Sequence, residues 1–427
     1  MTDAMRAPQR RSRRGRYLAL AATAALLPAL LATSACGGPA DAATGKSELT
    51  VLTFAPAGTG ATDRPGMTAL AGAIGAEIDA QGGISGHRLK VLTCNEHNTA
   101  DGAAACARQA VDAGAVAVVG SYSQFGDTFM PLLENARIPY IGGYGLSRPE
   151  FTSPISYPVA GGTPALIAGS GRQLVAAGCR TVSLIRPDTP AGDNLVGALA
   201  GALNPAGVKL TDVRTGEKST DYTGQAKQAI GDDKPNNCVT AALGPVPTLN
   251  LLDSLRRQPH KNTRLASVIG SFQQSVVDST GGDTGPLGGA YATGWYPPET
   301  SAVWDPLRAT VRTHGAADVN IDDADPGVET TWVGYQVFLK AVQRLGSHPV
   351  TPQSLRETLD NGGPIDTGGA TPPLSWGLTS MLASADSPRL VNTSVTFQQV
   401  QGGRLVEQQP GFVDVRWVLT GGKPPAS

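Results

Sequence analysis

Strand-like and helix-like hydrophobic patterns alternate along most of the chain. Residues 89–93 alternate apolar and polar side chains, whereas residues 116–119 are all apolar, a pattern typical of a strand buried on both faces of a parallel sheet. An alanine-rich helix is expected between these two segments, with Asn98 or Thr99 as its N-cap. This order of strand, helix and strand predicts a parallel α/β arrangement.

The expected strand at residues 116–119 ends abruptly in a run of glycine and polar residues. In an open α/β sheet, ligands bind beyond the carboxyl ends of the strands, and Gly120 lets the backbone turn closely there. The hydroxyl and backbone N–H groups that follow are therefore candidate ligand contacts, and they belong to Ser121, Tyr122, Ser123 and Gln124. An alternative role for Ser123 is a structural cap of the next helix.

The same alternation starts again at about residue 162 and predicts a second α/β lobe. Strands are expected there at residues 181–185, 208–213, 238–243 and 265–270, and helices at residues 164–177, 194–203, 221–230 and 247–258. Later segments favour helices at residues 303–313, 329–345 and 351–359 and strands at residues 290–295, 394–400 and 411–415. In the middle helix, Val333, Val337, Ala341 and Leu345 form a core-facing stripe.

Three sequence runs carry a resemblance to a known family. They are DAQGGISGHRLKV at residues 79–91, NTAD at 98–101 and AVAVVGSYS at 115–123. This succession resembles the leucine/isoleucine/valine-type solute-binding proteins of ABC importers, from about residue 48 to about residue 417. The resemblance implies an α/β fold with two doubly wound parallel-sheet lobes joined by a three-crossing hinge, the type I periplasmic binding clamshell. Such clamshells close around a ligand by hinge motion.

The resemblance also implies a division of the chain. The first lobe is expected at residues 48–158 and 292–388, and the second at residues 159–291 and 389–420. It further implies a monomer that binds a small polar, amino-acid-like molecule, presents it to an ABC permease and needs no cofactor. Two alternatives are a sensor domain of the same fold without transport and an exported hydrolase.

Several candidate ligand contacts are suggested by the resemblance and by the positions of residues just after the expected strands. In the family, the loops after the first lobe's third and fourth strands hold the ligand's polar head, which points to Ser123 and to the second loop's Gly143 and Tyr144. Tyr144 departs from the small residue and threonine common in amino-acid binders. Trp295 falls at the second crossing, where it is expected either to wall the ligand or to pack the hinge. Arg186 and Asp188 follow a second-lobe strand and either face the cleft or pair with each other.

The N-terminal segment predicts export. Residues 1–35 combine an arginine-rich start, an apolar stretch and small residues, which is typical of a signal peptide. Cys36 follows these small residues as in a bacterial lipobox, so we expect it to be lipidated and to anchor the protein to the outer face of the cell membrane. Residues 36–47 suit a flexible tether. A plain secretory signal is the alternative, and Arg13-Arg14 hints at twin-arginine export.

Four cysteines remain beyond Cys36, and an exported protein is expected to use them in disulfides. Four cysteines allow three pairings. We expect Cys94–Cys106 and Cys179–Cys238, one bond in each lobe, because a bond between lobes would lock the hinge. Reduced buried thiols are the alternative.

Other functions find little support in the sequence. The formal net charge of −1 gives no indication of nucleic acid as a partner. The sequence has no nucleophile elbow, no HExxH zinc motif and no P-loop, so no catalytic residue is expected. No metal ligand set is expected either, because the acidic group Asp322, Asp323 and Asp325 lacks the pattern of a calcium loop and suits a solvated loop.

Overall fold

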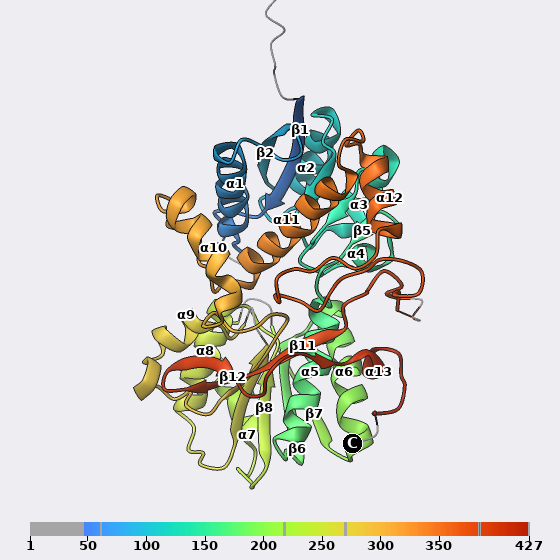
Figure 1. Cartoon of the computed structure of the whole chain (residues 1–427). Helices are drawn as coiled ribbons and strands as arrows, with labels where there is room; N and C mark the ends of the chain where they lie inside the picture. Colours follow the sequence, from blue (N-terminus) through green and yellow to red (C-terminus); the bar gives the residue numbers. More distant parts are fainter. Residues whose placement is uncertain are drawn as a thin grey trace, which may run out of the picture. The chain divides into compact units, whose positions relative to one another are not determined.

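A computed structural model of the 427-residue chain describes residues 47–59, 62–216, 219–268, 271–382, 384 and 386–425. The expected signal peptide, Cys36 and nearly all of the tether lie outside these residues. The described residues form two sheets with helices around each (Figure 1). The elements on the first sheet are called the first lobe here, and those on the second sheet the second lobe.

The first lobe is built on a parallel sheet in the order β2-β1-β3-β4-β5. Its strands are β1 (Ser47–Ala55), β2 (His87–Asn95), β3 (Ala117–Val119), β4 (Tyr140–Ile141) and β5 (Ser156–Tyr157). The helices between these strands are α1 (Pro65–Ala80), α2 (Ala100–Asp112), α3 (Gly126–Ala136) and α4 (Arg148–Thr152). Later in the chain, this lobe gains α10 (Asp305–Thr310), α11 (Pro326–Leu345) and α12 (Pro352–Asn361).

Alternating side chains of the central strands explain why helices cover both faces of this sheet. Leu52 and Val118 pack with the apolar sides of α2 and α3, whereas Val51 and Val119 pack with α1 and α11. All four are fully buried, as expected for a strand that is apolar on both faces. The helix α2 begins at an N-cap formed by Thr99, whose side chain accepts a hydrogen bond from the backbone N–H of Gly102.

The second lobe is built on a mixed sheet in the order β12-β11-β10-β9-β8-β6-β7, with β13 paired to β11. Its parallel strands are β6 (Thr181–Pro187), β7 (Lys209–Thr215), β8 (Asn237–Ala241), β9 (Arg264–Val268) and β10 (Tyr291–Gly294). The antiparallel strands are β11 (Ser394–Gln401), β12 (Arg404–Glu407) and β13 (Val413–Asp414). The helices are α5 (Gly162–Ala176), α6 (Pro190–Leu203), α7 (Thr223–Ile230), α8 (Pro245–Arg256), α9 (Gln274–Ser279) and α13 (Arg416–Leu419).

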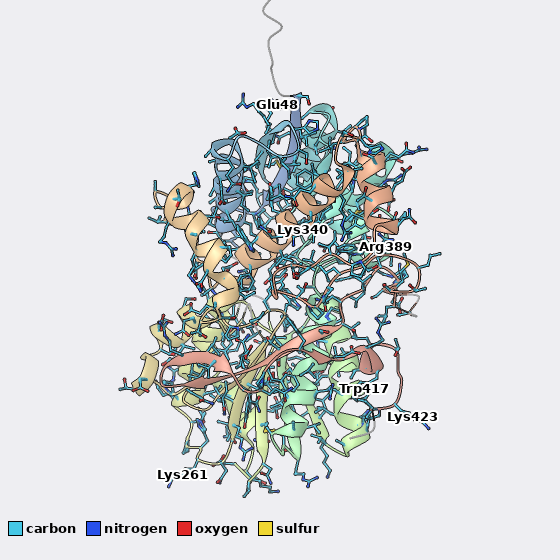
Figure 2. All side chains as sticks on the ribbon, viewed as in Figure 1. Glu48, Lys261, Lys340, Arg389, Trp417 and Lys423 are labelled. Carbon is cyan, nitrogen blue, oxygen red and sulfur yellow. A yellow bond between two sulfur atoms is a disulfide. The ribbon has the colours of Figure 1, made fainter. Side chains whose placement is uncertain are left out.

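The chain passes between the lobes three times, after β5, after β10 and after α12. The third passage is tied to the first. Arg389, labelled in Figure 2, donates from Nε to the Ser156 carbonyl at 2.9 Å and stacks on the ring of Tyr157. Trp376 donates from Nε1 to the Pro158 carbonyl at 3.1 Å. After this third passage the chain forms the antiparallel strands β11 and β12 (red in Figure 1), which join the second sheet although they lie far from its other strands in sequence.

Helix α11 approaches the carboxyl edge of the first sheet so closely that glycine is required at the contact. A Cβ atom on Gly142 would lie 2.5 Å from the Cα of Gly334, and one on Gly120 would lie 2.8 Å from the Cα of Thr331. Gly120 and Gly142 also have positive φ angles of 60° and 67°. Thr331 fixes the contact by donating from Oγ1 to the Gly120 carbonyl at 2.9 Å.

Each lobe contains one disulfide, and both pairings are those expected from the sequence. Cys94 at the end of β2 is bonded to Cys106 on α2, and Cys179 before β6 is bonded to Cys238 on β8. Each bond joins elements of the same lobe, and neither links one lobe to the other.

Several local features differ from the sequence expectations. Helix α4 was not predicted, and it begins where the Glu150 carboxylate accepts hydrogen bonds from the backbone N–H and the hydroxyl of Ser147. The helix expected at residues 303–313 is divided into a 3₁₀ turn (Ala302–Trp304), α10 and a π-helical turn (Val311–Gly315). Beyond Gly402-Gly403 the chain forms β12, a hairpin partner of β11 that the sequence pattern did not reveal.

Candidate functional site

The loop after β3 leaves the carboxyl edge of the first sheet as expected, but its serines bond to the scaffold. Ser121 is buried, and its hydroxyl accepts a hydrogen bond from the backbone N–H of Phe54 at the end of β1. Ser123 is also buried, and its hydroxyl donates to Oε2 of Glu96 at 2.7 Å while accepting from the N–H of Phe125 at 3.0 Å. The second contact is the capping role that the sequence left open for this serine.

Glu96 is a buried carboxylate that sequence reasoning missed. Burial raises its pKa, and the hydrogen bond from Ser123 opposes that rise. Its other oxygen, Oε1, has no hydrogen-bond partner among the described residues. Glu96 follows β2 directly, so the rule about strand ends that singled out Ser123 would also have found this residue.

The remaining loop residues divide into exposed and packed positions. Gln124 is exposed, and its amide donates to Oγ1 of Thr62 and to Oδ1 of Asn98. Gly143, after β4, lies buried against Tyr140, where a Cβ atom would come within 2.1 Å of the ring. Gly143 therefore serves close packing, and its lack of a side chain is a steric requirement.

Three predicted aromatic residues come together between the lobes. The ring centroid of Tyr144 lies 4.9 Å from that of Tyr122 and 4.9 Å from that of Trp295. Trp295 is 1% exposed and donates from Nε1 to the Gly162 carbonyl at 2.9 Å, so it packs at the crossing. Burial raises the pKa of Tyr144 to about 12, which keeps its hydroxyl protonated at neutral pH. We call Tyr122, Tyr144 and Trp295 the aromatic group.

A partly buried arginine accompanies the aromatic group. The guanidinium of Arg64 lies 5.8 Å from the ring centroid of Tyr122 and 5.4 Å from that of Tyr144, within cation–π range. Its Nη1 forms an ion pair with Oδ2 of Asp325 at 2.6 Å. Arg64 is the N-cap residue of α1, at the far end of the loop that follows β1, and sequence reasoning did not select it.

The two predicted second-lobe charges lie in a separate cluster. Arg186 is 1% exposed and bonds both oxygens of Asp212, at 2.8 and 2.7 Å, and also Asp193 at 2.7 Å. Asp188 pairs with Arg214 at 3.1 Å. The expectation that Arg186 and Asp188 pair with each other is therefore wrong, because β7 supplies a nearer partner for each. The hydrogen bond from Arg186 lowers the pKa of Asp212.

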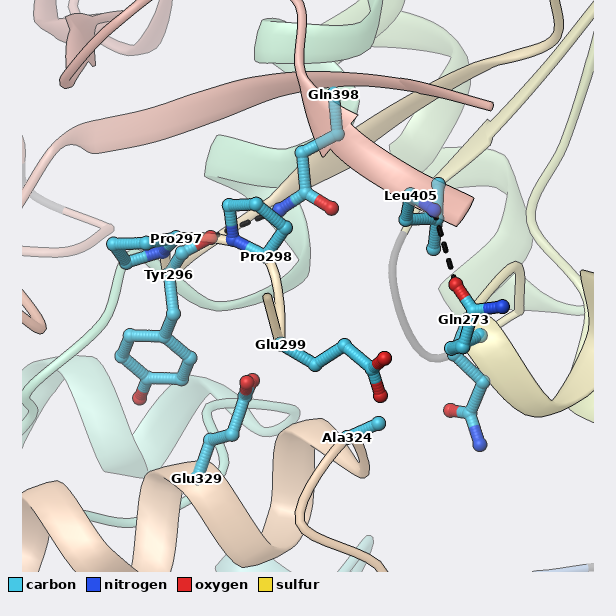
Figure 3. A pocket seen from close by; sticks show the side chains of 10 residues that line it. Gln273, Tyr296, Pro297, Pro298, Glu299, Ala324, Glu329, Gln398 and Leu405 are labelled. Carbon is cyan, nitrogen blue, oxygen red and sulfur yellow. Dashed lines mark hydrogen bonds between the residues drawn. The ribbon is translucent and has the colours of Figure 1, made fainter. Parts of the chain in front are cut away.

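A polar pocket opens where residues of both lobes meet the second crossing (Figure 3). It encloses about 320 Å³, including space open to solvent. The first lobe contributes Ala324 and Glu329, and the second lobe contributes Gln273, Gln274, Gln398 and Leu405. The crossing contributes Tyr296, Pro297, Pro298 and Glu299. Tyr296 connects this pocket to the aromatic group, because its ring centroid lies 6.2 Å from that of Trp295.

Glu329 gives the pocket its electrostatic character. Its side chain is buried, and within the described residues its carboxylate has no hydrogen-bond or ion-pair partner. Burial raises its pKa well above the usual value, and the nearby carboxylates of Asp325, Asp322, Asp323 and Glu299 add to the rise. The sequence carried a signal for this residue, since Glu329 stands four positions before Val333 and extends the core-facing stripe of α11.

Two α/β lobes linked by three crossings, with a polar pocket between them, define a ligand-binding protein of the clamshell type. This chain belongs to the periplasmic binding protein family, whose family model matches residues 52–403. The family expected from the sequence is thereby confirmed, as is its fold. The family consists of solute-binding proteins and implies an extracytoplasmic location.

Solved structures with the same fold are distant in sequence. A branched-chain amino acid ABC transporter protein from Thermus thermophilus with bound valine has a TM-score of 0.72 at 13% identity, and the match covers 88% of this chain and 100% of that chain. A possible leucine/isoleucine/valine-binding protein from Rhodopirellula baltica SH 1 has a TM-score of 0.69 at 15% identity, covering 86% and 97%. A fatty acid ABC transporter substrate-binding protein from Thermomonospora curvata has a TM-score of 0.69 at 14% identity, covering 87% and 94%.

No curated protein sequence matches this chain. Among the described residues, no helix has the length and apolar character needed to cross a bilayer. At these identities the structural matches show the fold alone, so the ligand has to be inferred from the pocket.

Proposed function

We propose that this protein is the extracytoplasmic solute-binding component of an ABC importer and that it holds a small polar molecule between its lobes. The observation that carries the proposal is the pocket, whose walls come from both lobes and from the second crossing in a chain that belongs to the periplasmic binding protein family. The named functions of the similar structures, for valine and for fatty acids, support uptake by an ABC transporter.

The proposed site has two parts. The pocket binds the polar group of the ligand, Tyr296 supplies an aromatic wall, and the aromatic group packs behind Tyr296 through Trp295. Ser121, Ser123, Gln124 and Gly143 hold the first-lobe loops in place around it. Arg186 and Asp188 do not belong to the proposed site, because their charges are paired within the second lobe.

The mature protein is proposed to be a monomer attached to the outer face of the membrane through a lipid on Cys36. One acyl chain gives marginal attachment, and two or more give stable anchoring. The anchored body would then deliver its closed, ligand-bound form to the permease, and binding would be non-covalent and without turnover.

A thermal-shift screen of small solutes against the purified protein tests binding. A solute that raises the melting temperature and is recovered chemically unchanged supports a binding protein, whereas product formation would support an exported hydrolase. Uptake of the same solute by cells with and without the gene then separates transport from sensing. Uptake that does not depend on the protein would favour the sensor.

A further inference from the structure

We propose that the ligand is an organic cation, a primary amine without a carboxylate, whose ammonium group binds between Glu299, Glu329 and Gln273. The inference rests on the proposed function, because it names the chemical class of the solute held in the same pocket. It also departs from the named ligands of the similar structures, one of which is an amino acid and one a fatty acid.

The strongest observation is the unpaired carboxylate of Glu329. The residue is 5% exposed, and no described residue bonds or pairs with its side chain. Figure 3 shows this side chain rising from α11 towards the crossing segment at Tyr296 and Glu299. A buried charge without a partner is unfavourable, so natural proteins pair such a group or place it where a ligand does so. A bound ammonium group would supply the missing partner.

Two further acceptors line the same pocket. Gln273 is 7% exposed, and its Oε1 has no hydrogen-bond partner among the described residues. Glu299 lines the same pocket, and Figure 3 shows its carboxylate directed towards Ala324 and Gln273. Two carboxylates and an amide oxygen from different parts of the fold are three acceptors, and an ammonium group has three N–H donors. The acceptor set therefore suits a primary amine.

The surrounding charges exclude a ligand carboxylate. The pocket lining contains no lysine or arginine. The nearby Arg64 is paired with Asp325 at 2.6 Å, and Arg404, which does not line the pocket, is paired with Glu299 at 3.1 Å. Asp322 and Asp323 lie close enough to raise the pKa of Glu329 and have no cationic partner among the described residues. A ligand with a carboxylate in this pocket would meet like charge.

The walls beside the acceptors suit an organic cation. Tyr296, Pro297 and Pro298 present aromatic and aliphatic surface next to Glu329. Tyr296 leads to Trp295 and so to the aromatic group. An amine whose carbon chain extends towards these residues would bury apolar surface while its ammonium stays between the carboxylates.

Isothermal titration calorimetry with a defined panel tests the inference. The amines are n-butylamine, 1,4-diaminobutane, agmatine and tyramine. Butan-1-ol and 4-methylphenol are matched compounds without the ammonium group, and L-valine, L-leucine and decanoate represent ligands that carry a carboxylate. We expect at least one amine to bind and its uncharged counterpart to bind at least tenfold more weakly.

Two variants localise the binding. Glu329→Gln keeps the shape of the side chain and removes its charge, and it should weaken amine binding about tenfold or more. Glu134→Gln is the matched control, because it makes the same chemical change at an exposed position on α3. It should leave amine binding unchanged. The folding of both variants is verified by their melting temperatures.

The possible outcomes separate this inference from the proposed function. Binding of an amine that is lost in Glu329→Gln but kept in Glu134→Gln supports the inference. Equal amine binding by the wild type and Glu329→Gln overturns it. Binding of an amino acid or decanoate in place of the amines also overturns it and leaves the proposed function intact. If no amine binds, the inference fails, and the thermal-shift screen decides the proposed function separately.

Discussion

The hydroxyl of Ser123 lies 2.7 Å from Oε2 of Glu96, and both side chains are buried beside the carboxyl end of the first sheet. The same hydroxyl accepts the N–H of Phe125, so one serine joins the end of β2 to the start of α3. This arrangement makes the loop after β3 part of the rigid frame of the first lobe.

Ser123→Ala should therefore destabilise the protein. The change removes the side-chain hydrogen bond of a buried carboxylate, a loss of about 1–3 kcal/mol in the free energy of unfolding. Differential scanning calorimetry should show a lower melting temperature. Gln124→Ala on the same loop, where the amide is exposed, should change it little. An unchanged melting temperature together with weakened ligand binding would instead show that the Ser123 hydroxyl serves the ligand.

Glu329→Gln should make the ligand-free protein more stable at neutral pH. The folded-state pKa of Glu329 is raised above its unfolded value. Its contribution to stability is therefore fully present below the unfolded pKa, about 4.3, and is lost as the pH rises through the folded pKa. At pH 7 the variant should melt roughly 1–4 °C higher than the wild type, and the difference should shrink towards pH 4. A lower melting temperature at pH 7 would mean that the carboxylate is paired in solution.

Amine binding should weaken as the pH falls. The ammonium stays protonated, whereas Glu329 takes up a proton at a pH above the ordinary glutamic acid value, because burial and its acidic neighbours raise its pKa. Calorimetric titrations between pH 8 and pH 4 should show this loss, and Glu329→Gln should reduce the pH dependence. The titratable groups that interact with this carboxylate and share in the effect are Asp325, Asp322, Asp323, Glu299, Tyr144 and Tyr296. Arg64 and Arg404 act through their ion pairs with Asp325 and Glu299.

The two disulfides should contribute unequally to stability. Cys179 and Cys238 are 59 positions apart, whereas Cys94 and Cys106 are 12 apart. Loop-closure entropy then predicts a loss of about 4 kcal/mol for Cys179→Ala with Cys238→Ala and about 3 kcal/mol for Cys94→Ala with Cys106→Ala. Urea unfolding of the two double variants measures this order. The reverse order would show that local packing, and not chain entropy, determines the contribution of each bond.

Cys36→Ser should release the protein from the membrane. The sequence around Cys36 resembles a lipobox, and the substitution removes the thiol that would carry the lipid. Fractionation of cells should find the wild type with the membrane and the variant in the soluble extracellular fraction. A wild type that is already fully soluble outside the cell would refute the anchor.

The sequence pattern located most of the elements because they depend on local order, whereas the pairing of the cysteines followed from the division into two lobes, since a bond between lobes would lock the hinge. Residues 116–119 are apolar without interruption, and Thr99 stands at the start of an alanine-rich helix, so periodicity and capping chemistry located β3 and α2. Helix α4 has five residues, too few for a period to show. Strand β12 was missed because its register comes from pairing with β11 across a glycine turn.

The site was predicted less completely because its contacts join distant parts of the chain. Strand ends drew attention to Tyr122 and Tyr144, and the second crossing to Trp295, and the structure brings these three rings together. Arg186 was expected to face a ligand, but its partner Asp212 lies on a neighbouring strand, and such pairing depends on sheet register. To identify Glu329 as a pocket residue requires both its place on the helical stripe and the position of the other lobe. Only the helical stripe can be read from the sequence.

The glycine contact between α11 and the first sheet offers a way to distinguish positions that are needed for folding from positions that are needed for solute binding. In a library of all substitutions sorted for folded protein alone, positions 120, 142 and 334 should accept almost nothing but glycine, because a side chain there would push α11 away from β3 and β4. Position 329 should accept uncharged residues of similar size in that library, because the fold does not need the carboxylate. When the same library is sorted for solute uptake, position 329 should become restrictive while the glycine positions keep their profile.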